Sequence, residues 1–92
     1  MKPIENNRII AEFMGLPSIN DEGQVNFIKG LKHTPDYELQ YHSNWNWLMP
    51  VVEEIYQLGL DNESALLVRD AVAEANLDNT YKAVVEFIKQ LN

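Results

Sequence analysis

The residues best suited to chemistry lie in one segment, 41–55, which reads YHSNWNWLMPVVEEI. His42 precedes Ser43 directly and so places a base beside a hydroxyl nucleophile. Sequence neighbours rarely form such a catalytic pair, and the chain has no G-x-S-x-G turn that would expose a nucleophilic serine. Ser43 is expected to cap the helix that follows, because a serine hydroxyl accepts a hydrogen bond from a free amide of the first helical turn. The segment therefore does not predict an enzyme.

Metal and phosphate chemistry is also not expected. The candidate metal ligands are His33, Asp36, Glu38 and His42. The two histidines lack the i, i+4 spacing by which a helix presents two imidazoles to one ion, so a solvated hairpin is the expected environment of this set. The sequence contains no cysteine, which excludes thiolate ligands, and its four glycines stand alone rather than in a phosphate-binding loop. We expect no metal and no cofactor.

Aromatic side chains in the same segment could instead form a stacking platform for a base, a sugar or a peptide. Trp45 shares a helical stripe with Leu48 and Val52, which predicts that Trp45 lies largely in the core. Trp47 lies off this stripe, at the edge of burial, where a half-exposed tryptophan often anchors a partner. The predicted interaction residues are Tyr41, His42 and Trp47.

Composition narrows the classes of partner. The 92 residues predict a single domain over 1–92, and fourteen acidic against seven basic residues give a net charge of −7. The basic residues are scattered, whereas binding to a phosphate backbone or to an anionic membrane needs several cations on one face. An N-terminus without an apolar run, no segment long enough to span a bilayer and the lack of cysteine together favour the cytoplasm.

The N-terminal half is expected to contain one helix and two strands. Residues 5–15 predict a helix whose start is capped by Asn6 or Asn7 and whose end is set by Gly15. The stretch PSINDEG has turn chemistry. The segments QVNFIKGL and YELQY predict two short strands, with Pro35 interrupting the pairing between them. A hairpin is the expected arrangement.

The C-terminal half is expected to be helical. A second helix begins after Ser43 with Pro50 on its polar side, or becomes regular only near Pro50. A third helix covers 61–76 with Asp61 or Asn62 as its cap, although residues 65–69 also fit a strand. A fourth begins after Asp78 and carries a continuous apolar face: Tyr81, Val84, Val85, Phe87, Ile88 and Leu91. The expected class is α+β, a small layered fold with an N-terminal helix, a short β-hairpin, and two or three helices packed over it.

Three blocks of the sequence, RIIAEFMG, YHSNWNWLMPVVEEI and YKAVVEFIKQLN, carry a resemblance to a known family. They resemble short proteins of bacteriophages and of Bacteroides-type bacteria that are similar to the phage ABA-sandwich domain. The chain departs from that pattern at Asn46, where the family usually has an acidic residue, and at Gln90 and Leu91, where it often has aromatic residues. The resemblance implies helices packed on a sheet. It implies no activity and carries over no catalytic or binding residue.

The function favoured by these observations is a non-enzymatic accessory or protein-interaction module of phage or mobile-element origin. The alternative is an acidic DNA mimic that occupies the basic groove of a host nuclease or DNA-binding protein, for which carboxylates would have to be arrayed on one face. We expect a protein partner, which includes a second copy of the chain in a homodimer. We expect neither direct binding to nucleic acid nor binding to a membrane.

Overall fold

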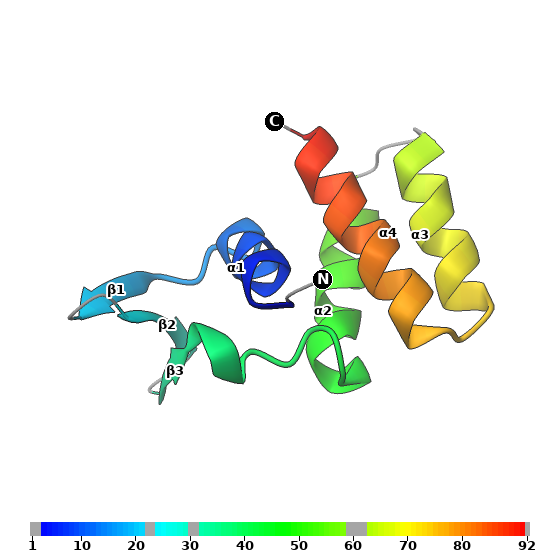
Figure 1. Cartoon of the computed structure of the whole chain (residues 1–92). Coiled ribbons are helices and arrows are strands. Elements are labelled where there is room, and N and C mark those ends of the chain that lie inside the picture. Colours follow the sequence, from blue (N-terminus) through cyan, green and yellow to red (C-terminus); the bar gives the residue numbers. More distant parts are fainter. Residues whose placement is uncertain (1–2, 22–23, 30–31, 59–62, 92) are drawn as a thin grey trace. The chain divides into compact units, whose positions relative to one another are not determined.

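A computed structural model describes residues 3–21, 24–29, 32–58 and 63–91, and the chain divides into two compact units at Leu39 and Gln40. The first unit holds helix α1, a three-stranded sheet and a short 3-10 helix, and the second holds helices α2, α3 and α4 (Figure 1). The predicted α+β class, with an N-terminal helix, antiparallel strands and then helices, is confirmed. That the whole chain forms one domain stays a prediction.

Helix α1 spans Pro3–Phe13. Its first residue is a proline, which suits that position because the first amides of a helix have no partner within it. Asn7 was expected at the start of the helix but lies inside it, buried, where its Nδ2 donates a 3.0 Å hydrogen bond to the carbonyl of Leu39. Gly15 ends the helix as predicted: its φ is +75°, and its amide donates to the carbonyl of Glu12 at 3.0 Å. This is the left-handed helix ending that glycine favours.

The strands are β1 Ser18–Asp21, β2 Gln24–Lys29 and β3 Lys32–Pro35, in the antiparallel order β1-β2-β3. The prediction was correct for β2 only. Residues 18–21 were expected to form a turn but pair along β2, and residues 37–41 were expected to form a strand. Instead Asp36–Glu38 forms the 3-10 helix η1, directly after Pro35 ends β3. Proline is tolerated there because β3 is an edge strand.

Helix α2 spans Trp45–Gln57 and is continuous through Pro50, so a helix that starts only near Pro50 is excluded. Its cap is Asn44 rather than Ser43: the side chain of Asn44 accepts a 2.9 Å hydrogen bond from the amide of Asn46. Pro50 is exposed, as predicted, so water can reach the carbonyl that it leaves without a helical donor. The buried face comprises Leu48, Val51, Val52 and Ile55.

Helices α3, Glu63–Ala73, and α4, Leu77–Gln90, lie side by side and both contact α2 (Figure 1). Residues 65–69 lie within α3 and are helical, so the alternative that they form a strand is wrong. The predicted caps of α3 fall outside the described residues. The cap of α4 is Asn76 instead of Asp78, and it accepts a 2.9 Å hydrogen bond from the amide of Asn79. The predicted apolar face of α4 is buried except for Leu91, which follows the last helical residue and is exposed.

Ala75 follows the end of α3 in the left-handed conformation, with φ of +55°, and its amide donates to the carbonyl of Val72 at 2.9 Å. An alanine there carries a steric cost of about 1 kcal/mol that glycine avoids. We expect Ala75→Gly to raise the free energy of unfolding by about 0.5–1 kcal/mol in urea melts. The control Ala83→Gly, inside α4, should lower the free energy of unfolding by about 1 kcal/mol. A loss of stability for both variants would contradict the left-handed conformation of Ala75.

Candidate functional site

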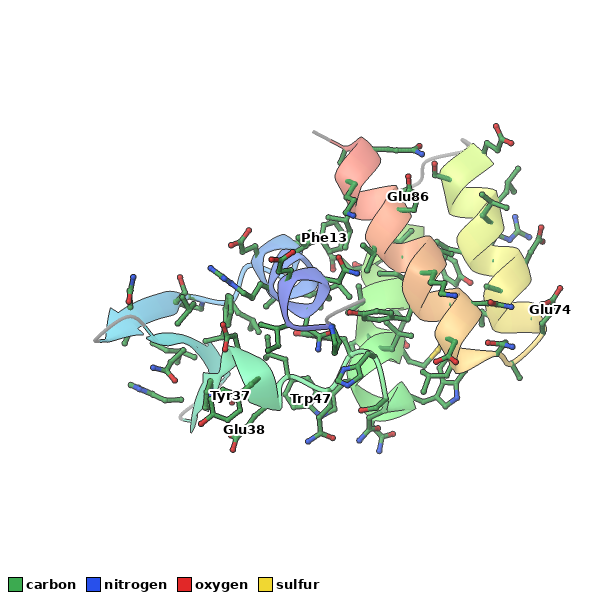
Figure 2. All side chains as sticks on the ribbon, viewed as in Figure 1. Phe13, Tyr37, Glu38, Trp47, Glu74 and Glu86 are labelled. Atoms are coloured by element: carbon green, nitrogen blue, oxygen red, sulfur yellow. The ribbon has the colours of Figure 1, made fainter. Side chains whose placement is uncertain are left out.

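The structure brings the three predicted interaction residues into two aromatic contacts within the second unit. The rings of Tyr41 and Trp47 meet edge to face with centroids 5.3 Å apart. The rings of His42 and Tyr81 lie 6.1 Å apart, also in an edge-type arrangement. Tyr41 is only 4% exposed, whereas His42 and Trp47 are half-buried. Trp47 lies in the first turn of α2 (Figure 2). The role of these residues in interaction stays a prediction.

Burial changes the acidity of the two tyrosines in these contacts. Desolvation raises the pKa of Tyr41 and the pKa of Tyr81, each to about 12 from an ordinary value of 10.0. Burial disfavours the charged phenolate, so both rings stay protonated over the physiological range. Each neutral phenol packs edge-on against another ring within this unit, Tyr41 against Trp47 and Tyr81 against His42.

The residues considered for catalysis and metal binding are spread over different elements. His33 is exposed on β3, Asp36 and Glu38 belong to η1, and Ser43 is an exposed residue of the turn before α2. Within the part of the chain that the structure describes, histidine and carboxylate side chains form no group of three that could hold a metal ion. In the same residues, no helix is both long and apolar enough to cross a membrane.

A hollow of about 410 Å³ lies between the first turn of α3 and the last turn of α4. Its walls include Leu67 and Leu91, which are 54% and 44% exposed, and Phe87, which is 1% exposed. The hydroxyl of Ser64 donates a hydrogen bond to Oε1 of Gln90 across the two helices. This bond holds the two helices together beside the hollow. The hollow therefore lies between two regular helices, which keep its shape.

The apolar wall of the hollow continues onto the outer face of α3. Leu66 and Leu67 are 46% and 54% exposed on a helix whose opposite side is buried. At 100° per residue, Glu63 and Asp70 fall within about 20° of one another on α3. Glu74 directly follows the last residue of α3, and its amide still donates a helical hydrogen bond to the carbonyl of Asp70 at 3.2 Å, so it continues the same face. All three are exposed, and Glu74 projects from the end of α3 (Figure 2). We call this set of residues the α3 face: Glu63, Leu66, Leu67, Asp70 and Glu74.

Sequence reasoning did not identify the α3 face as a site. The signal was present, because Leu66 and Leu67 lie outside the narrow stripe of small residues that the helix buries. Two adjacent large apolar residues on the polar side of an amphipathic helix have no structural role unless another element covers them. Leu91 was expected to point inward and contributes to the exposed surface instead.

Comparisons of the chain with protein-family models, curated proteins and solved structures found no match.

Proposed function

We propose that the protein is a non-enzymatic interaction module that binds a protein partner through the α3 face and the adjoining hollow. The observation that carries the proposal is the exposure of three leucines, Leu66, Leu67 and Leu91, beside a hollow whose wall reaches Phe87. Exposed apolar side chains that adjoin a concave site are typical of protein-binding surfaces. Covering them would remove apolar area from water, which is the main favourable term in association.

The geometry favours a protein over a small molecule as the occupant. The hollow is at the low end of the roughly 300–1,000 Å³ typical of ligand pockets, and its apolar wall continues onto the convex surface of α3. A small ligand would cover the hollow and leave Leu66 in water. A partner that lays an extended apolar face along α3 and inserts one side chain into the hollow covers all three leucines. Central anchors of this kind supply most of the binding energy in protein interfaces.

Selection of peptides from a random display library on the immobilised full chain tests the proposal. Most selected peptides should lose at least ~10-fold in affinity for the double variant Leu66→Ser, Leu67→Ser, since truncation of a central apolar anchor commonly costs more than 1 kcal/mol. The control is Leu58→Ser, which removes a leucine of similar exposure from the end of α2 and should leave affinity unchanged. Binders that ignore the α3 leucines would contradict the proposal, and binders lost only with Trp47→Ala would move the site to the aromatic contacts.

A second candidate function is an acidic DNA mimic, which the alignment of Glu63, Asp70 and Glu74 along α3 favours. Leu66 and Leu67, which lie among these carboxylates, support the interaction module more strongly, because a phosphate backbone presents no comparable apolar side chains. A mimic would inhibit a DNA-binding protein in competition with duplex DNA, and inhibition would persist after Leu66→Ser. The proposed setting is the cytoplasm, and the proposed origin is a phage or mobile element, as the resemblance of the sequence implies.

A further inference from the structure

We infer that the partner of the α3 face is a cationic amphipathic helix, a segment with leucine-like residues on one side and lysine or arginine along its margins. The inference rests on the proposed function and adds the chemistry of the partner. Two features of the α3 face lead to it: the length over which its apolar and acidic residues run together, and the charge of the unit that carries it.

The length of the α3 face matches a short helix. Glu63 and Glu74 delimit three helical turns, and the exposed leucines lie between them. A helix laid along this face presents side chains at i, i+3, i+4 and i+7, which is the spacing needed to contact Leu66, Leu67 and the mouth of the hollow together. An apolar side chain of the partner can then enter the hollow between Leu67 and Leu91, above Phe87.

Charge selects the residues at the margins of the partner. Residues 40–92 contain eight acidic and three basic residues, a net charge of −5. On α3 itself the single basic residue, Arg69, falls about 120° from the centre of the α3 face, on the side of Leu66. Glu63, Asp70 and Glu74 lie nearer to the centre, between the angular positions of Leu66 and Leu67. Cationic side chains on a partner would approach all three carboxylates, and this attraction would raise the rate of association. The same carboxylates would repel an acidic competitor.

The same charge argues against a second copy of the chain as the occupant. An isologous dimer through the α3 face would bring Glu63, Asp70 and Glu74 of one copy against the same three residues of the other. Like charges placed opposite one another across an interface oppose binding, and no lysine or arginine belongs to the α3 face to offset them. The face is therefore suited to a partner of opposite charge.

Three synthetic helical peptides of about 14 residues, enough to cover three turns, test the inference. They share one leucine face and differ only at the polar positions, which are all lysine, all glutamine or all glutamate. Fluorescence anisotropy with the full chain should show the lysine peptide binding about tenfold tighter than the glutamine peptide, since three exposed ion pairs contribute about a factor of two each. The glutamate peptide should not bind, and high ionic strength should remove the advantage of lysine.

Matched variants assign the effect to the α3 face. The triple variant Glu63→Gln, Asp70→Asn, Glu74→Gln should bind the lysine and glutamine peptides equally. The control Glu53→Gln, Glu54→Gln, Glu86→Gln makes the same change in net charge on α2 and α4 and should keep most of the preference for lysine. Equal loss in both variants would overturn the inference in favour of non-specific attraction to an acidic protein, and so would failure of the lysine peptide to bind at millimolar concentration.

The outcomes separate this inference from the proposed function. If the lysine and glutamine peptides bind equally and both lose affinity with Leu66→Ser, Leu67→Ser, the α3 face is a docking site but its partner is not cationic. If the lysine peptide binds tighter than the glutamine peptide and keeps its full affinity for the variant Leu66→Ser, Leu67→Ser, the acidic residues bind cations without the apolar contact, and the proposed function fails.

Discussion

Phe87→Ala is expected to lower the free energy of unfolding by about 3–5 kcal/mol, a large part of the stability of a domain of this size. Phe87 is 1% exposed on the inner face of α4 and borders the hollow beside α3. Truncation removes the largest buried side chain of that helix end, and the Ser64–Gln90 hydrogen bond between the two helices limits how far they can collapse into the space. The remaining cavity adds to the lost transfer free energy.

Urea melts followed by circular dichroism measure this loss, and Leu91→Ala provides the control. Leu91 borders the same hollow but is 44% exposed, so its truncation should cost about 0.5 kcal/mol or less. A similar loss for both variants, or a Phe87→Ala protein within about 1 kcal/mol of the wild type, would show that the α3–α4 end is not packed as described.

Alkaline pH is expected to produce the second large loss of stability. The pKa of Tyr41 and the pKa of Tyr81 are each raised to about 12 in the folded protein by burial, from an ordinary value of 10.0. As the pH rises, the unfolded chain therefore loses these protons first. The stability contributed by the two protonated rings is complete below pH 10 and is lost as the pH rises through about 12. Between these values the free energy of unfolding should fall by about 1–2 kcal/mol per pH unit.

Single tyrosine variants show whether these two rings cause the loss. Tyr41→Phe and Tyr81→Phe keep the edge-to-face contacts with Trp47 and His42 but remove the titrating hydroxyl. Each should remove about half of the slope measured by urea melts across this pH range. A slope that is unchanged in both variants would mean that other groups destabilise the protein at high pH.

Elements whose pattern is local in the sequence were predicted better than elements that depend on contacts between separate segments. The inner face of α4 was predicted correctly because its apolar period is local and uninterrupted from Tyr81 to Ile88. Strand β1 was missed because its polar residues become a strand only by pairing with β2, a contact between segments that local patterns do not reveal. The alternation at 37–41 was misleading, since the segment after Pro35 turns into η1.

The face of α2 was predicted with an error in rotation. Trp45 was expected to lie largely in the core with Leu48 and Val52 but is half-buried as the first residue of the helix. The buried face is centred nearer to Val51, which is fully buried. A helical wheel orders residues around the axis but does not say which neighbours cover them. The interaction residues predicted from the sequence were Tyr41, His42 and Trp47, and their role stays a prediction. Which residues of α3 and α4 are exposed depends on the side of α3 that packs against the other helices, and tertiary packing sets that side.

The most direct test of the central claim, that the α3 face binds a protein partner, is an amide chemical-shift titration of the full chain with the lysine peptide. Shifts are expected to be concentrated in residues 63–74 and 87–91, with little change in 41–47. Shifts confined to 41–47 would place binding at the aromatic contacts of Tyr41 and Trp47. Shifts spread evenly over acidic residues of both units would contradict a specific docking surface on α3.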